Sequence, residues 1–317
     1  MASRKSREVW DPTGAFFVTT DSGNGSRLSG DWSSVLVAEP ELPKPPKELL
    51  FRRRVSLWPS LVEMWDAREI TRSLAERQLR ARYKQAILGF LWAIITPLVL
   101  MVAFTLVFDR VGNINTQGAP YSLFSYLGLL PWSFFSAAVT AGSISLISNL
   151  ALINKIFCPR EVFPLSGVVV AAIDLLLSLL ALAVLFVVLG FAPRGTSVWV
   201  VLIIPVLLLT TIAWSILVAV TTVYVRDLRT ALPLILQVGL FATPVAYGFD
   251  VFPRDLRGIY SFLNPLGPVI DGLRRTVLFG QHPDFSELGL AAVGAVLYFM
   301  LGYWAFKRME TGIADVA

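Results

Sequence analysis

The chain has 317 residues, of which 55% are hydrophobic and only 15% are charged, and its mean hydropathy is +0.66. Soluble domains carry about 25% charged residues, so the composition indicates an integral membrane protein, and a net charge of +5 does not suggest nucleic-acid binding. The single cysteine, Cys158, excludes an intramolecular disulfide framework.

Residues 1–60 are predicted to form a flexible cytoplasmic tail. The segments 22–30 and 39–47 are rich in Gly, Ser and Pro and bury too little apolar surface to order themselves. Residues 1–47 contain no apolar stretch of the signal-peptide type, so we expect the tail to stay in the cytoplasm. The three arginines at 52–54 allow two interpretations, an attraction to anionic lipid and a solvated run of charge.

Residues 61–85 are predicted to form a helix that lies at the membrane interface. The segment 68–84 contains six Lys or Arg, and neither Gly nor Pro occurs from Asp66 to Gln85. The apolar positions form two narrow stripes, which suits a helix with lipid on one side and protein on the other. The next 23 residues, 86–108, carry no charge and are long enough to cross the hydrocarbon core. Because basic flanks stay on the cytoplasmic side, this junction predicts the orientation of the first span.

Residues 86–317 are predicted to form an all-α transmembrane domain with six spans. Each span is an apolar run of about 18 or more residues with few charges. The six predicted spans are 86–108, a helix within 121–147, 164–191, 198–225, 232–249 and 288–306.

The loop 250–288, before the last span, contains two apolar stretches that are too short to cross, 259–263 and 266–270. Both stretches are associated with prolines, so we expect short re-entrant helices in this outer loop. The expected inner segments hold 12 Lys and Arg, against 6 in the expected outer loops. This bias predicts that both termini are cytoplasmic.

Asp174 is the lone carboxylate of the predicted third span. An ionisable residue at this depth is a candidate functional residue. It could also pair with a neighbouring helix, and the sequence leaves both roles open.

Motifs of several enzyme classes are absent from the sequence. It contains no P-loop, no H-E-x-x-H and no G-x-S-x-G, and its only histidine is His282. We therefore expect no catalytic residues, no metal site and no cofactor on this chain. The scarcity of charges within the spans also argues against a proton- or sodium-coupled carrier, whose relays need ionisable groups at depth.

Three stretches of the sequence together carry a resemblance to a known family. They are RYKQAILGFLWAIITPLVLMVAFTLVF (82–108), NLALINKIFCPREVFPL (149–165), and VRDLRTALPLILQVGLFATPVAYGFDVFP (225–253) with LNPLGPVIDGLRRTVLFG (263–280). In their order and spacing they resemble the permease subunit of ABC-2 type exporters, in the branch that exports O-antigen and teichoic acid. The resemblance covers about residues 60–310. The long N-terminal tail departs from the family pattern, as does Cys158, where an apolar residue is expected.

The resemblance implies a multi-pass protein of the bacterial cytoplasmic membrane, surrounded by membrane lipids. It implies a homodimer of permeases bound to two copies of a separate ATPase subunit, which would hold ATP and Mg²⁺. The expected substrate is a lipid-linked glycan.

The loop after the predicted second span is the candidate contact with the ATPase. It combines an apolar patch with two basic residues, as expected for a short helix held in a partner's groove. The candidate coupling residues are Leu152, Ile153, Lys155, Ile156, Phe157 and Arg160, together with Arg226 and Asp227 from the next cytoplasmic turn. The alternative is a loop helix that lies along the membrane.

Aromatic residues are the candidates for the substrate path, because sugar rings stack on aromatic faces through their C–H surfaces. The candidates are Trp92, Tyr126, Trp132, Phe134 and Tyr247. Trp and Tyr also form the interfacial belts of ordinary membrane proteins, which remains the alternative for each of them.

The sequence therefore predicts the permease subunit of an ATP-driven exporter of lipid-linked cell-surface polysaccharide. One alternative is an ABC-2 exporter of a drug or a lipid. A second is a membrane glycosyl- or acyltransferase, which would need acidic or His residues at a membrane face.

Overall fold

The structure, a computed structural model, describes residues 7–10, 16–19, 57–83, 89–111, 116–153, 155 and 158–310. The chain divides into two units, Met1–Arg53 and Arg54–Ala317. In the first unit, strands β1 (Arg7–Trp10) and β2 (Phe16–Thr19) pair in antiparallel fashion, with Arg7 opposite Thr19. The other residues of the predicted tail, up to residue 56, lie outside the described residues. The first helix begins at Leu57.

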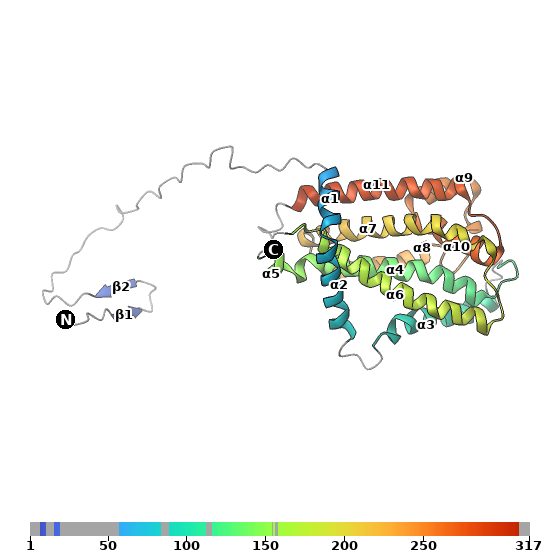
Figure 1. The fold of residues 1–317 in the computed structure, drawn as a ribbon, viewed down its shortest axis with the longest axis horizontal. Helices are drawn as coiled ribbons and strands as arrows, with labels where there is room; N and C mark the ends of the chain where they lie inside the picture. Colours follow the sequence, from blue (N-terminus) through green and yellow to red (C-terminus); the bar gives the residue numbers. More distant parts are fainter. Residues whose placement is uncertain are drawn as a thin grey trace. The chain divides into compact units, whose positions relative to one another are not determined.

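The second unit is a bundle of long helices that run side by side (Figure 1). Within the described residues, five helical segments are long and apolar enough to span a membrane. Their helices are α3 (Leu91–Val111), α4 (Tyr121–Ser148), α6 (Val162–Val188), α7 (Val200–Tyr224, extended at its start by the 3₁₀ turn η3, Gly195–Trp199) and α11 (Phe285–Met309). The predicted all-α membrane architecture is confirmed, and the observed helices lie close to five of the predicted spans.

The predicted fifth span, 232–249, differs from the observed helix. Helix α8 covers Leu228–Ala242, only 15 residues, or about 22 Å, which is shorter than the hydrocarbon core of about 30 Å. Thr243 is extended, with φ −91° and ψ 141°. It precedes Pro244, whose ring disfavours a helical conformation of the residue before it. The six-span count is therefore not confirmed.

The turn after α8, residues 243–247, is held by Arg274, at the end of α10. The Arg274 side chain is 1% exposed and donates to the backbone oxygens of Pro244 (2.8 Å), Val245 (2.5 Å) and Tyr247 (2.9 Å). It also donates to the Phe124 oxygen of α4 (3.0 Å), and its guanidinium lies 3.6 Å from the centre of the Phe124 ring. The sequence-based count included Arg274 among the charges of the outer loop; its side chain is buried, so it is not a solvated loop charge, and the side of the membrane on which this loop lies stays a prediction.

Short helices fill the segment between α8 and α11. They are η4 (Phe249–Val251), α9 (Arg254–Leu263), α10 (Leu266–Arg274) and the π-helix η5 (Arg275–Phe279). The two apolar stretches that were expected to form short helices lie in α9 and α10. Helix α10 is buried along most of its length, whereas α9 is largely exposed.

The basic helix predicted at 61–85 corresponds to the end of α1 (Leu57–Asp66) and to α2 (Arg68–Tyr83), which are separated at Ala67. Both helices run crosswise to the long helices (Figure 1). Only Thr71, Leu74 and Ala75 of α2 are buried. This crosswise orientation supports an interfacial helix, whose position relative to a membrane stays a prediction.

The buried apolar residues form two clusters. The main core is built by the long helices together with α10. The second, which we call the smaller core, lies where α2, the end of α4, the start of α6 and the ends of α7 and α11 meet, and it includes Leu146, Phe163, Val223 and Phe306. The segment between α4 and α6 packs against the smaller core.

Small residues let the long helices approach one another closely. A Cβ atom at Gly142 of α4 would lie 2.9 Å from the backbone oxygen of Ser215 in α7 and would collide with the Ser215 hydroxyl. A Cβ at Gly302 of α11 would lie 2.9 Å from the Ala213 oxygen, also in α7. Such contacts are typical of helix packing in membranes.

We therefore expect Gly142→Ala to destabilise the bundle by about 1–3 kcal/mol, because α4 and α7 must separate to admit the methyl group. The measurement is the thermal unfolding midpoint of the purified protein in detergent. Gly289→Ala in α11 is the matched control, since nothing lies within 4 Å of the added Cβ there. An equal midpoint for both variants would contradict the close approach.

Candidate functional site

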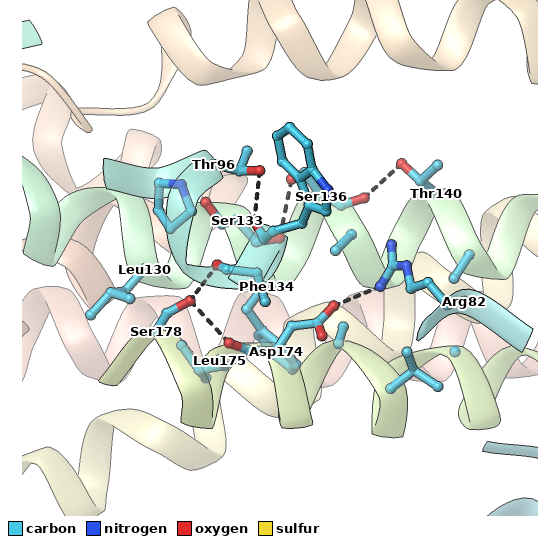
Figure 2. A pocket seen from close by; sticks show the side chains of 18 of the residues that line it. Arg82, Thr96, Leu130, Ser133, Phe134, Ser136, Thr140, Asp174, Leu175 and Ser178 are labelled. Atoms are coloured by element: carbon cyan, nitrogen blue, oxygen red, sulfur yellow. Dashed lines mark hydrogen bonds and ion pairs between the residues drawn. The ribbon is translucent and has the colours of Figure 1, made fainter. Parts of the chain in front are cut away.

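A cavity of about 710 Å³ lies between α2, α3, α4 and α6. Figure 2 shows that its walls carry both aromatic and hydroxyl side chains. It is lined by three of the five predicted path residues, Trp92, Trp132 and Phe134. It also contains Asp174, the carboxylate that the sequence left with two roles.

The three aromatic residues differ in how much surface they offer to a ligand. The Trp132 side chain is 7% exposed and that of Phe134 is 2% exposed. The Trp132 ring packs against Gly239 of α8, where an added Cβ would lie 2.8 Å from the indole. Trp92 is 53% exposed, so it offers the most accessible aromatic face of the three.

Hydroxyl groups line the wall of the cavity beside these rings. Thr140 donates to the Ser136 oxygen (2.7 Å), Ser136 to the Ser133 oxygen (3.2 Å), and Thr96 to the Trp92 oxygen (2.9 Å). Each hydroxyl thus uses its proton within its own helix and keeps lone pairs that can accept from a ligand. The cavity therefore combines apolar faces with hydrogen-bond acceptors.

Asp174 ties α6 to α2 at the edge of the cavity. Its carboxylate accepts from Arg82 Nη1 at 2.7 Å and from the Tyr83 hydroxyl. Further along α2, Gln78 donates to the Ser166 hydroxyl at 2.8 Å, and Arg77 donates to the Asn149 amide oxygen at 2.5 Å. The pairing interpretation of Asp174 thus agrees with the geometry, and polar bonds add to the apolar contact of Leu74 in fastening α2 to the bundle.

The other two predicted path residues lie away from the cavity. Tyr126 is fully buried, and its hydroxyl donates to the Ser178 oxygen at 3.0 Å. Tyr247 lies in the turn after α8, where its hydroxyl donates to the Phe241 oxygen at 2.9 Å. Their side chains take part in internal packing, and a role of any of the five in glycan movement stays a prediction.

The candidate coupling residues lie in two segments. Helix α5 is only Leu150–Ile153, and both Leu152 and Ile153 are half-buried against the smaller core, so only part of each is available to a partner. Lys155, Arg226 and Asp227 are exposed, whereas Ile156 and Phe157 lie outside the described residues.

Arg160 of the same group donates to the backbone oxygen of Glu310. Next to it, Glu161 is fully buried and pairs with Lys307 of α11, with 2.5 Å between Nζ and Oε1. The sequence did not identify this pair, because Lys307 was counted as a basic flank of the last span. Excluding the buried Arg274 and Lys307 removes one charge from each side of the count and leaves its bias unchanged.

Comparisons with known proteins place the chain in a family. The model described as "ABC-2 type transporter" matches residues 70–279. The chain belongs to this family. The matched range includes all but the first two residues of α2, the cavity, the segment 149–161 and Arg274.

Several relatives of the ABC-2 chain have names that describe their transport function. An "O-antigen export system permease protein RfbA" from Myxococcus xanthus is 33% identical over 74% of this chain and 90% of its own length. A protein of the same name from Klebsiella pneumoniae is 26% identical over 77% and 93%. The "Polysialic acid transport protein KpsM" of Escherichia coli is 20% identical over 74% and 91%. The predicted resemblance to ABC-2 polysaccharide permeases is confirmed.

The Asp174 pair allows a test of how α2 is held. We expect Asp174→Ala to speed amide hydrogen exchange in α2 on the order of tenfold, because the loss of two hydrogen bonds lowers local stability by about 1–2 kcal/mol. The measurement is exchange of peptides from residues 68–83. Asp255→Ala, at an exposed carboxylate of α9, should leave α2 unchanged, and unchanged exchange in Asp174→Ala would contradict the polar attachment.

Proposed function

We propose that this chain is the permease subunit of an ATP-driven exporter of lipid-linked cell-surface polysaccharide. The observation that carries the proposal is the similarity to an O-antigen export permease, at 33% identity over 74% of the chain. Two further relatives are also named for O-antigen export or polysialic acid transport.

The cavity supports a glycan as the transported group. A sugar presents C–H faces that stack on aromatic rings and hydroxyls that donate hydrogen bonds. The exposed indole of Trp92 and the acceptor lone pairs of Ser136 and Thr140 offer both kinds of contact within one cavity. A purely apolar drug or lipid would leave these hydroxyls unused.

The energy source in this proposal is a separate ATPase subunit that holds ATP and Mg²⁺, because the sequence contains no P-loop. The segment 149–160 and the turn at 225–228 are proposed to contact it. Both lie at the same end of the bundle, since Arg160 and Tyr224 bond the backbone of Glu310 and Met309. This end is then cytoplasmic, together with both termini.

A second copy of the chain is proposed to complete the path, giving two permeases and two ATPase subunits in the cytoplasmic membrane. Helix α3 supports this arrangement. It is the least buried of the five candidate spans and exposes Val99, Val102, Leu106 and Val107. Such a face has to contact either lipid or another protein surface.

Deletion of the gene tests the function directly. We expect the polymer to disappear from the cell surface and to accumulate inside the cell on its lipid carrier, because synthesis continues while export stops. The measurement is glycan immunodetection on intact and on lysed cells. Loss of polymer in both samples would favour a transferase, and unchanged surface polymer would favour an exporter of a drug or lipid.

The ATPase contact can be tested with charge reversals. We expect Lys155→Glu combined with Arg226→Glu to lower co-purification of the ATPase at equal permease level. Each exposed contact is worth about 0.2–1 kcal/mol, and the reversal adds repulsion. Arg254→Glu, exposed on α9 in the expected outer loop, should retain the ATPase. Full retention by the double variant would show that the contact lies elsewhere.

A further inference from the structure

The last turn of α11 is tied to the start of α6 by a buried ion pair. Glu161, the residue before α6, is fully buried, and the Lys307 side chain is 8% exposed. The 2.5 Å contact between them is extended by Glu310, whose Oε2 lies 3.1 Å from Lys307 Nζ. We call Glu161 and Lys307 the α6–α11 ion pair.

Two further bonds converge on the same turn of α11. The Arg160 guanidinium donates to the Glu310 backbone oxygen, and the Tyr224 hydroxyl donates to the Met309 oxygen at 2.6 Å. The segment 149–161 and the end of α7 are therefore both fastened to one place. The proposed function assigns residues 149–160 and the turn at 225–228, which directly follows α7, to the ATPase contact.

The stability of the fold does not by itself explain why charged residues occupy the positions of the α6–α11 ion pair. Around it the smaller core supplies fully buried aromatic rings from Phe163 and Phe306. In such surroundings an apolar pair of similar volume stabilises a protein at least as well as an ion pair. A charged pair differs in holding specific partners, here Lys307 with Glu161 and Glu310, and the charges of Glu161 and Lys307 also suit the helix ends on which they lie.

We propose that the α6–α11 ion pair is the positioning contact that passes the movement of the segment 149–161 to α11 during transport. The inference rests on the proposed function, because that function supplies the ATPase that moves the segment. Helix α11 packs along α7 and α9. A shift of its last turn therefore reaches the opposite end of the bundle.

The experiment uses the whole chain in complex with its ATPase and measures glycan exported per ATP hydrolysed. Glu161→Gln and Lys307→Met each remove one charge. We expect both variants to retain the ATPase and to hydrolyse ATP, while the export ratio falls at least about fivefold, the lower range of typical coupling between sites. Glu76→Gln, in an exposed ion pair with Arg72 on α2, is the control and should keep the wild-type ratio.

If a single variant fails to accumulate, the double variant Glu161→Leu with Lys307→Leu separates a loss of protein from a loss of coupling. It removes both buried charges, and Glu310, which loses Lys307 as a partner, has a side chain that is 21% exposed to solvent, so the protein level should recover. We expect its export ratio to stay low, because the directed contact is missing. Recovery of export together with protein level would overturn the inference and make the pair purely structural.

The two proposals fail in different ways. If wild-type chain neither retains an ATPase nor places polymer on the surface, the proposed function fails and this inference falls with it. If the wild-type complex does both and Glu161→Gln keeps the wild-type export ratio, only the inference is overturned.

Discussion

Backbone polar groups that are shielded from water need hydrogen-bond partners within the protein, and this holds for any chain inside a bilayer. The buried Arg274 side chain supplies such partners. Helix α8 ends before Pro244, and the carbonyls of the turn that follows, residues 243–247, lie outside any helix. Arg274 donates to three of them and to Phe124. The Nε, Nη1 and Nη2 atoms of Arg274 reach four backbone oxygens, whereas a lysine would have to donate to all of them from its single Nζ atom. The break in α8 thus requires an arginine, and the burial of α10 beside α4 follows from placing it.

Polar ties of the same kind hold the elements that cross or end the bundle. Apolar contact joins the long helices in the main core, whereas α2 and the end of α11 combine apolar contact in the smaller core with polar bonds, α2 to Asp174 and Ser166 and α11 to Glu161. A hydrogen bond or ion pair depends on a specific partner in a specific geometry, so its loss affects the contact between two helices only. An apolar core spreads the same loss over many contacts. The chain therefore combines apolar packing of the long helices with a few specific polar contacts at α2 and at the end of α11.

The sequence predicted the long helices well and the contacts between them poorly. Runs such as 164–191 and 198–225 exceed the bilayer thickness, so hydropathy alone finds them, but it also counted 232–249, where Thr243 and Pro244 interrupt the helix. Counting of basic residues could not separate a buried Arg274 from a surface charge. Trp92 and Phe134 meet at the cavity only because α3 and α4 pack together, and no local pattern in the sequence encodes that packing.

Helix α6 connects two regions to which the proposals above assign a role in transport. Its N-terminal end follows Glu161, and 13 positions later Asp174 faces the cavity and holds α2, a separation of about 20 Å along one helix. Pro164 lies in the first turn, where a proline does not interrupt the hydrogen bonds of the helix. A displacement of the start of α6 therefore also displaces the carboxylate to which Arg82 and Tyr83 are bound. The wall of the cavity and the joint with α11 belong to one rigid element, so neither can move without the other.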